Sequence, residues 1–320
     1  MPLGEFDLIE RFFSRAGGRA DVLLGVGDDA ALLEVPPGRA LVAAVDTLVE
    51  GRHFLPGAPP ESVGHQALAV NLSDLAAMGA EPAWALLSLS LPAAEEAWLA
   101  RFSAGLYGLA ERYGVALVGG DTVRGPLVVT IAALGFVAPQ MALRRDGARP
   151  GDVLFVSGWP GEAAAGLEQL QRAPATSDAD PLVRRYRYAE PRLALGRALA
   201  GRASAAMDVS DGLFGDLQKL CAASGAAARL DLERLPISTE LARRQARPDC
   251  ERLVLFGGDD YELLFTVPSD RAASVEAELA ATQGAIAVHR IGVIEAGAGV
   301  RCVRDGHAET LHGGGYDHFA

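Results

Sequence analysis

The sequence predicts an α/β (α+β) protein of two domains. Both halves of the chain alternate apolar, strand-like runs with helical patterns, and acidic residues stand in the loops between them. A chain of 320 residues is long enough for two domains of ordinary size, and half of its residues are hydrophobic. A charged stretch with proline and glycine at residues 144–152 marks the expected boundary. We therefore assign residues 1–143 to an N-terminal domain and residues 144–320 to a C-terminal domain.

Apolar spacing and stop signals predict the elements of the first half. Phe6, Ile9 and Phe13 recur at helical spacing, which predicts an amphipathic helix at residues 4–14. Gly79 is typical of the C-terminal end of the helix expected at residues 61–79, since glycine readily adopts the left-handed conformation there. The other expected elements are strand-like runs at residues 22–33 (broken by Gly-Asp-Asp), 41–49, 83–91, 115–122 and 127–137, and helices at residues 61–79 and 92–113.

The second half continues the alternation. Residues 152–162 read as a strand, a glycine turn and the start of an alanine-rich helix. Residues 173–190 are polar and contain Pro174 and Pro181, which predicts a mobile loop. The remaining elements are a run at 205–212 leading into a helix at 213–223, a glycine-Asp turn and strand at 253–267, helices at 191–199 and 271–281, and a strand at 288–294.

Charge and composition exclude several classes of partner. The formal net charge of −12 argues against nucleic acid, because binding to a phosphate backbone requires clustered Lys and Arg. Lys219 is the only lysine and lies in a helical pattern, so no Walker-type loop can exist here. No apolar run is long enough to span a bilayer, and the N-terminus lacks a basic signal pattern. We expect a cytoplasmic protein without a membrane partner.

Cysteine and histidine spacing disfavours zinc and disulfides. Cys221, Cys250 and Cys302 stand far apart with no CxxC pair, which is typical of reduced thiols. The six histidines are scattered, with no HExxH pattern.

The most informative stretch is a helix of small residues at 70–80 that carries one carboxylate, Asp74. An isolated buried carboxylate is expensive, so Asp74 either faces solvent or meets a metal ion. The alternative is that Ser73 and Asp74 form a capping pair. Asp residues at the edge of apolar or glycine-rich runs recur at Asp28, Asp29, Asp46, Asp121, Asp208, Asp211, Asp259 and Asp260. Each Gly-Asp pair is also a turn pattern, but several Asp residues at strand ends suit Mg²⁺, which prefers oxygen ligands.

Six motifs together resemble the thiamine-monophosphate kinase family. They are GDDA at 27–30, DTLVEGRHF at 46–54, NLSDLAAMGA at 71–80, GGDT at 119–122, DVSDG at 208–212 and GGDDYE at 257–262. The Asp-rich motifs also occur in the related aminoimidazole ribonucleotide synthetases and selenophosphate synthetases. His53-Phe54, the Asp-Tyr-Glu run and the terminal Tyr-Asp-His-Phe are similar to the thiamine family in particular, and the match spans nearly the whole chain.

The resemblance implies a fold and an activity. The expected fold has two α/β domains with an ATP cleft between them, and the N-terminal sheet forms a barrel across a homodimer. The expected reaction transfers the γ-phosphoryl group of ATP to thiamine monophosphate, giving thiamine diphosphate and ADP with several Mg²⁺ ions, as the last step of thiamine diphosphate biosynthesis.

The resemblance also assigns residues, none of them as an acid or base. The implied magnesium ligands are Asp29, Asp46, Asp74, Asp121, Asp208 and Asp211. The implied ATP-binding residues are Tyr107, Gly120, Asp121, Arg145 and Ser210, and the implied substrate-binding residues are His53, Glu262 and Tyr316. The chain departs from the family where Ala44-Val45 precede Asp46 in place of hydroxyl residues, so metal contacts there are left to backbone carbonyls or water.

Other interpretations remain open at this point. His53 is also typical of a surface turn, Tyr107 of a core tyrosine and Tyr316 of C-terminal packing. The alternative functions are a sister enzyme that uses ATP on another acceptor, such as a purine-pathway amidine cyclisation, and a non-catalytic nucleotide-binding regulator.

Overall fold

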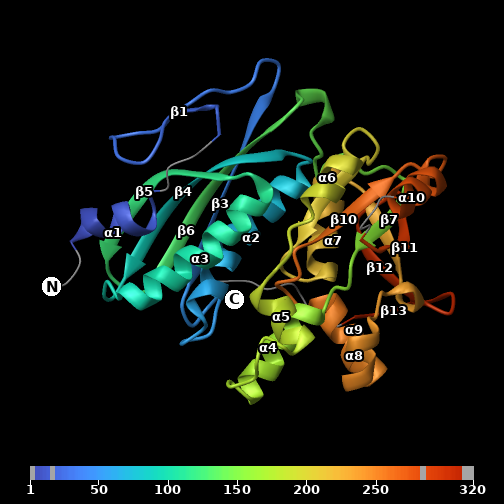
Figure 1. The fold of residues 1–320 in the computed structure, drawn as a ribbon. Coiled ribbons are helices and arrows are strands. Elements are labelled where there is room, and N and C mark those ends of the chain that lie inside the picture. The colour runs from blue at the N-terminus through green and yellow to red at the C-terminus, as the bar shows by residue number, and fades with distance from the viewer. Residues whose placement is uncertain (1–3, 15–18, 282–285, 312–320) are drawn as a thin grey trace. The chain divides into compact units, whose positions relative to one another are not determined.

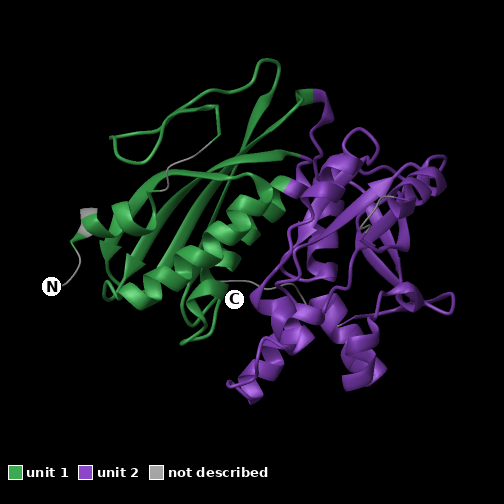
Figure 2. Cartoon of the chain, in the orientation of Figure 1, with its two compact units in different colours: residues 1–75, 80–139 green, residues 76–79, 140–320 purple. Residues whose placement is uncertain are grey.

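The computed structural model describes residues 4–14, 19–281 and 286–311 of the chain. The chain divides into two compact units, shown in Figure 2. Unit 1 consists of residues 1–75 and 80–139, and unit 2 of residues 76–79 and 140–320.

Unit 1 is built on a four-stranded sheet with the strand order β3-β6-β4-β5 (Figure 1). The β4–β5 pair is parallel, and the other two pairs are antiparallel. Its elements are α1 (Glu5–Phe12), β1 (Val22–Leu24), β2 (Leu32–Leu33), β3 (Ala40–Val49), α2 (Pro60–Ala77), β4 (Glu81–Leu91), α3 (Glu96–Tyr113), β5 (Ala116–Arg124) and β6 (Val128–Val137). The strands and helices predicted for this half therefore form, with ends shifted by a few residues.

Helices α2 and α3 lie on one face of this sheet and approach each other closely (Figure 1). Glycine makes the approach possible: a Cβ atom on Gly64 would lie 2.1 Å from the carbonyl oxygen of Phe102, and one on Gly105 would lie 1.9 Å from that of Glu61. Nearly every residue of α2 is buried. A helix that is buried on nearly all sides is typical of a core element.

The opposite face of the sheet exposes several large apolar side chains. Side chains alternate between the two faces of a strand, and on this side Leu41 and Val45 of β3 are 46% and 64% exposed. Leu86 of β4 and Val123 of β5 are 38% and 50% exposed. The polar residues Thr47, Ser88 and Asp121 are exposed on the same face. Several large exposed apolar side chains on one face are typical of an interaction site.

Unit 2 contains a seven-stranded sheet with the order β13-β12-β9-β11-β7-β10-β8. Only its β12–β9 pair is parallel. Its elements are β7 (Val153–Ser157), α4 (Glu162–Arg172), α5 (Pro181–Arg187), α6 (Leu193–Leu199), β8 (Ala205–Val209), α7 (Leu213–Ser224), β9 (Ala227–Asp231), α8 (Thr239–Arg244), α9 (Arg247–Phe256), β10 (Glu262–Val267), α10 (Ala272–Ala281), β11 (Val288–Glu295), β12 (Gly299–Arg304) and β13 (His307–Glu309). Short 3-10 turns lie at Pro139–Met141 and Leu232–Arg234.

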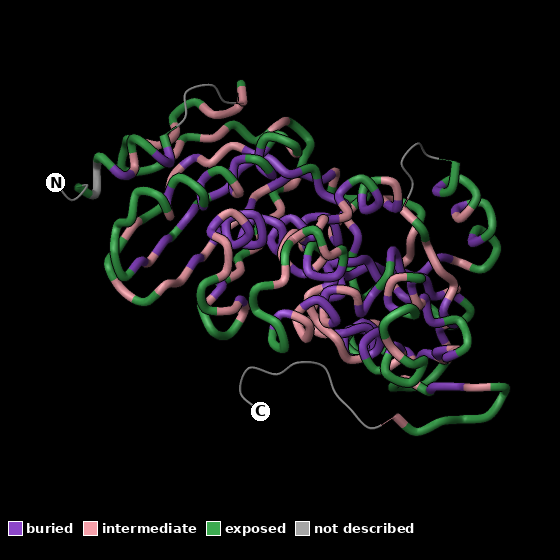
Figure 3. The backbone as a smooth tube through the Cα atoms, turned by 60° about the horizontal axis from the view of Figure 1, so that its bottom comes forward, coloured by how far each residue is buried: buried purple, intermediate pink, exposed green. Residues whose placement is uncertain are grey.

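The core of unit 2 packs α7 and α9 against the sheet. Leu213, Leu217 and Leu220 recur along α7 at helical spacing and are completely buried, as are Leu154 and Leu264 of the central strands. Buried runs such as these are purple in Figure 3. This core holds the ends of the central strands in place.

The prediction of a mobile loop at residues 173–190 is wrong over α5. Asp180 caps this helix, because its carboxylate accepts hydrogen bonds from the backbone N–H groups of Leu182 and Val183 at 3.0 and 3.4 Å. Pro181 occupies the first turn, where proline is favoured because its missing N–H group needs no partner there. The proline that suggested a loop is therefore a helix start.

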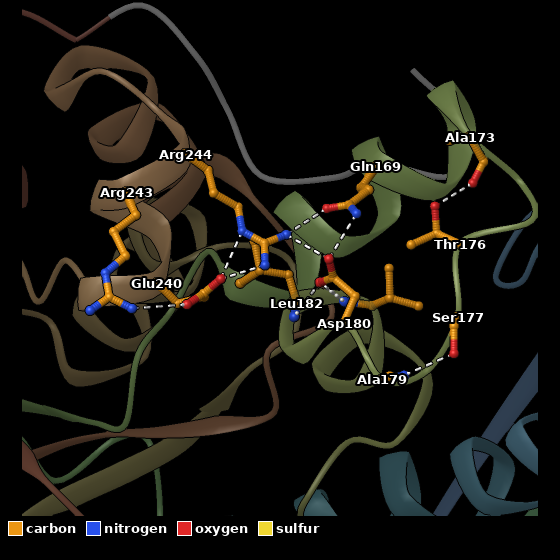
Figure 4. Close-up of polar contacts among 11 residues, drawn as sticks. Gln169, Ala173, Thr176, Ser177, Ala179, Asp180, Leu182, Glu240, Arg243 and Arg244 are labelled. Carbon is orange, nitrogen blue, oxygen red and sulfur yellow. Dashed lines mark hydrogen bonds and ion pairs between the residues drawn. The ribbon is translucent and has the colours of Figure 1, made fainter.

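The same carboxylate joins three helices (Figure 4). Arg244 of α8 donates to Asp180 at 2.7 Å and to Gln169 of α4 at 2.8 Å, and Gln169 donates to Asp180 at 2.8 Å. Leu182, Val183 and Tyr186 of α5 are buried. These contacts hold α5 against α4, and α5 carries an arginine into the site described below.

Candidate functional site

The candidate site of unit 2 lies where three neighbouring strands end. The sheet order places β10 between β7 and β8, and both pairs are antiparallel. The last residue of β7 is Ser157, the last of β8 is Val209, and the first of β10 is Glu262, which pairs with Val209. The loops after β7 and β8 and the turn before β10 therefore meet at one edge of the sheet.

The turn before β10 has a strained backbone. Asp259 and Tyr261 have φ angles of 66° and 52°, in the left-handed region that non-glycine residues rarely adopt. Such residues cost about 1–3 kcal/mol each, so surrounding contacts must hold them. Here the backbone N–H of Asp259 donates to the carbonyl of Ser210 at 2.9 Å, and that of Tyr261 donates to Val209 at 2.8 Å. This turn is thereby fastened to the loop after β8.

Glu262 is completely buried and joined to two arginines. Its carboxylate accepts hydrogen bonds from Ser157 at 2.6 Å, from the Nη2 atom of Arg185 at 2.7 Å and from the Nε atom of Arg192 at 2.7 Å. A second nitrogen of Arg192 completes a bidentate pair. Burial alone would raise the pKa of Glu262, but Arg192 and Arg185 outweigh burial and hold that pKa below its usual value.

Asp260 is also completely buried, and it caps α4. Its two carboxylate oxygens accept hydrogen bonds from the backbone N–H groups of Gly161 at 2.7 Å and Ala163 at 3.3 Å. Burial raises the pKa of Asp260 to about 8, against the opposing effects of Arg185 and of the Gly161 N–H.

This raised pKa predicts a stability profile that declines toward alkaline pH. The folded chain keeps the proton of Asp260 up to about pH 8, whereas the unfolded chain releases it near pH 3.9. The free energy of unfolding should therefore fall as pH rises through this window, by up to about 1.4 kcal/mol per pH unit. We expect Asp260→Asn to flatten this decline in urea unfolding at pH 6, 7 and 8, while the exposed Asp270→Asn keeps it. An equal slope in wild type and Asp260→Asn would contradict the assignment.

The loop after β8 is held by a carboxylate that the sequence interpretation missed. Asp216 of α7 is completely buried, and one of its oxygens accepts from the backbone N–H groups of Ser210 and Asp211, both at 3.0 Å. Its other oxygen accepts from Lys219 at 2.8 Å, and Lys219 also donates to the carboxylate of Asp211. Burial raises the pKa of Asp216, although Lys219 opposes the increase. Asp208 lies two residues before Ser210, within β8, and is 8% exposed.

The other four predicted metal ligands belong to unit 1 and lie on different elements. Asp29 is exposed in the loop between β1 and β2, Asp46 is half-buried within β3, and Asp74 is half-buried in α2. Asp121 is exposed within β5 and pairs with Ser88 of β4. The expectation that these carboxylates stand at strand ends is wrong for Asp46 and Asp121, because β3 and β5 extend past them.

The capping alternative for Ser73 and Asp74 is also wrong. The pair lies inside α2, which continues to Ala77, and Ser73 is completely buried. Asp74 therefore projects from the body of a helix.

The remaining predicted binding residues are in the following places. Tyr107 is a buried residue of α3 whose hydroxyl donates to the backbone carbonyl of Phe13 at 2.9 Å. His53 is half-buried, and its Nδ1 atom accepts from the backbone N–H of Val49 at 3.0 Å. Arg145 is exposed in unit 2, and Tyr316 lies outside the described residues. The nucleotide and substrate roles of these residues stay predictions.

Gly120 has a steric reason to be glycine. Its φ angle is 150°, and a Cβ atom there would lie 1.8 Å from the carbonyl oxygen of Leu87 on the neighbouring strand. Any side chain would force β5 away from β4 just before Asp121.

The donor chemistry of these side chains suits magnesium. Within the part of the chain that the structure describes, no three His, Cys, Asp or Glu side chains lie close enough to hold a metal ion by themselves. Mg²⁺ is commonly held by one or two carboxylates together with water and substrate phosphates, and the Asp211 carboxylate already accepts a cation, the ammonium of Lys219. The chemistry of the Asp211 carboxylate is therefore compatible with a share in holding a magnesium ion.

Three residues of this site escaped the sequence interpretation: Arg185, Arg192 and Asp216. Asp260 was counted among the recurring acidic residues but not as a buried helix cap. Asp216 had a signal, since Asp and Lys three residues apart on a helix can pair. Arg185 had only the signal of a basic helical turn and Arg192 had none, because their partner, Glu262, lies 77 and 70 residues further along the chain.

Comparisons with known proteins define the class. The model of the AIR synthase related protein N-terminal domain matches residues 27–137, and that of the C-terminal domain matches residues 149–305. The protein is therefore a two-domain, mixed α/β protein with an AIR synthase related fold.

Comparisons with individual proteins identify the family more narrowly than the domain models do. Thiamine-monophosphate kinase from Escherichia coli (strain K12) is 46% identical over 325 residues, covering 100% of this chain and 99% of the relative. A crystal structure of thiamine-monophosphate kinase from Stenotrophomonas maltophilia K279a has 45% identity and a TM-score of 0.87, covering 97% of this chain and 99% of that one. A structure of AaThiL complexed with AMPPCP and TMP has 34% identity and a TM-score of 0.78, covering 92% of each chain. The chain belongs to the thiamine-monophosphate kinase family.

Proposed function

We propose that this chain transfers the γ-phosphoryl group of ATP to thiamine monophosphate, giving thiamine diphosphate and ADP. The observation that carries the proposal is the full-length similarity to thiamine-monophosphate kinases, one of which forms a complex with AMPPCP and TMP. The acidic residues at the end of β8 support it: Asp208 lies in the strand, and the loop that follows is held by Asp216, which accepts from the backbone N–H groups of Ser210 and Asp211.

The reaction makes modest demands on the protein's side chains. The acceptor is a phosphate monoester whose second pKa is about 6, so its attacking oxygen is already ionised at neutral pH and needs no general base. The obstacle is repulsion between two polyanions, and bound Mg²⁺ supplies charge neutralisation and alignment for in-line transfer. The protein's part is to hold carboxylates where metal and phosphate meet and to orient both substrates.

We assign magnesium binding to carboxylates from both units. Those of unit 1 are Asp29, Asp46, Asp74 and Asp121, and those of unit 2 are Asp208 and Asp211. The proposed ATP-binding residues are Tyr107, Gly120, Asp121, Arg145 and Ser210. We propose that ATP binds in a cleft between the two domains, residues 1–143 and 144–320.

The substrate assignments are His53, Glu262 and Tyr316. Glu262 is enclosed by Ser157, Arg185 and Arg192, so its part in this site is to hold the two arginines and the strand ends in place. Tyr316 suits a cationic thiazolium ring, because an aromatic face attracts a cation by about 0.5–2 kcal/mol.

A direct assay separates this function from its alternatives. Purified chain supplied with ATP, Mg²⁺ and thiamine monophosphate should form thiamine diphosphate and ADP in equal amounts, measured by chromatography. ADP formation only with a different acceptor would favour the sister enzyme. Nucleotide binding without ADP formation from any acceptor would favour the regulatory protein.

We also propose a homodimer formed through the exposed face of the unit 1 sheet, closed into a barrel. Leu41, Val45, Leu86 and Val123 are the large apolar side chains exposed on that face. Val45→Asp should convert the protein to a monomer at micromolar concentration, because an unpaired charge at a buried interface is strongly unfavourable. Sedimentation velocity measures the change, and Met141→Asp, at an exposed apolar residue outside this face, is the control. An unchanged sedimentation coefficient in Val45→Asp would exclude this face as the interface.

A further inference from the structure

The only lysine of the chain, Lys219, forms an ion pair with Asp211, a carboxylate proposed to bind magnesium. Lys219 of α7 donates to Asp211 in the loop after β8 and, at 2.8 Å, to the buried Asp216. Its side chain is 43% exposed, that of Asp211 32% and that of Asp216 fully buried. The ammonium therefore bridges a buried carboxylate and one that faces solvent.

These contacts give the three side chains distinct tasks. Asp216 fixes the backbone of the loop through the N–H groups of Ser210 and Asp211. The two carboxylates and the ammonium together carry one negative charge, so Asp211 has a counter-ion before any metal arrives. Burial alone would lower the pKa of Lys219, but Asp211 and Asp216 raise it above its usual value, which keeps the ammonium charged at neutral pH.

We propose that Lys219 is a resident counter-ion that makes metal binding at Asp211 depend on nucleotide. The inference rests on the proposed function, because it takes Asp211 as a ligand of the magnesium ion that accompanies ATP. A free divalent cation must compete with the ammonium for the carboxylate. A metal–nucleotide complex brings phosphate oxygens as well, and these offer the displaced ammonium new acceptors.

The physical properties of lysine suit this task. Its ammonium is a compact charge on a flexible four-carbon stem, and it can change acceptors without moving the backbone of α7. The loop is unaffected by the exchange, since Asp216 still accepts from its two N–H groups. Asp211 would thus stay in position while its cation is replaced.

The test measures metal binding and does not depend on turnover. Mn²⁺ binding to the full-length protein is followed by electron paramagnetic resonance, with and without AMPPCP. Asp211→Asn identifies the binding event that involves Asp211. Lys219→Gln removes the charge and keeps a hydrogen-bond donor for Asp216, Lys219→Met removes both, and Lys219→Arg keeps the charge.

We expect wild type to bind Mn²⁺ at Asp211 more tightly when AMPPCP is present. In Lys219→Gln and Lys219→Met, Mn²⁺ without nucleotide should bind about 1.5-fold to fivefold more tightly, the scale of a partly exposed ion pair, and the enhancement by AMPPCP should shrink. Lys219→Arg should behave like wild type. Thermal unfolding establishes which variants are folded. One folded uncharged variant, Lys219→Gln or Lys219→Met, is enough for the test.

The experiment distinguishes a failure of the role of Lys219 from a failure of the assignment of Asp211 as a ligand. Unchanged Mn²⁺ affinity and unchanged AMPPCP enhancement in the folded uncharged variants would overturn the role of Lys219 while leaving Asp211 as a ligand. If Asp211→Asn binds Mn²⁺ as wild type does, both with and without AMPPCP, the ligand assignment in the proposed function fails, and this inference fails with it.

Discussion

Replacing Glu262 with alanine is expected to lower the free energy of unfolding of unit 2 by about 3–5 kcal/mol, the cost of removing one partner of a buried ion pair. The side chains of Arg185 and Arg192 are 12% and 15% exposed, so neither guanidinium can recover full hydration when the carboxylate is lost. Ser157 loses its acceptor as well. Urea unfolding followed by circular dichroism and by tryptophan fluorescence, to which Trp159 of this unit contributes, measures the loss.

A surface ion pair of the same unit provides the control. Glu295 pairs with Arg301, and their side chains are 32% and 50% exposed. Glu295→Ala should cost no more than about 1 kcal/mol, because exposed pairs are screened by solvent. If Glu262→Ala proves as stable as Glu295→Ala, the buried network does not hold this end of the sheet.

Replacing Asp74 or Asp211 with asparagine is expected to reduce turnover by about 10²–10³-fold while changing stability little. The exchange keeps the size of the side chain but removes a charge, and electrostatic contacts that act in the transition state are typically of this magnitude. Both aspartates are half-buried. The measurement is the rate of thiamine diphosphate formation at saturating ATP and Mg²⁺, together with the thermal unfolding midpoint.

The exposed Asp249 of α9 provides the matched control, since Asp249→Asn removes an equal charge without touching the site. Its turnover should equal that of wild type. A normal rate in Asp74→Asn would exclude a metal-binding role for Asp74, and a normal rate in Asp211→Asn would exclude one for Asp211.

The fold was most predictable where local signals agreed. Helix α3 begins after Pro92 and ends at Gly114, which adopts the left-handed conformation with a φ angle of 65°. Helix α2 was predicted because its residues are small and apolar and Gly79 follows it. Helix α5 was missed because a proline at a helix start looks like a loop residue until the Asp180 cap and its distant partner Arg244 are known.

For the site, the sequence indicated motifs but not the contacts that hold them. The strand ends that carry the DVSDG and GGDDYE motifs lie side by side in unit 2, since Glu262 pairs with Val209 on the next strand. The roles of Asp208, Asp211 and Glu262 stay predictions. The contacts that hold them are between residues far apart in the chain, such as Ser157 with Glu262 and Arg192 with Glu262. Tertiary packing creates such pairs, and no local sequence pattern predicts them.

The solitary lysine also makes the protein a convenient chemical reporter. An amine-selective acylating reagent can modify only the ε-amino group of Lys219 and the amino terminus of the chain. Because two carboxylates keep that amine protonated, its acylation should be slow in the resting protein. The mass added to one peptide would then follow events at this loop without any engineered label.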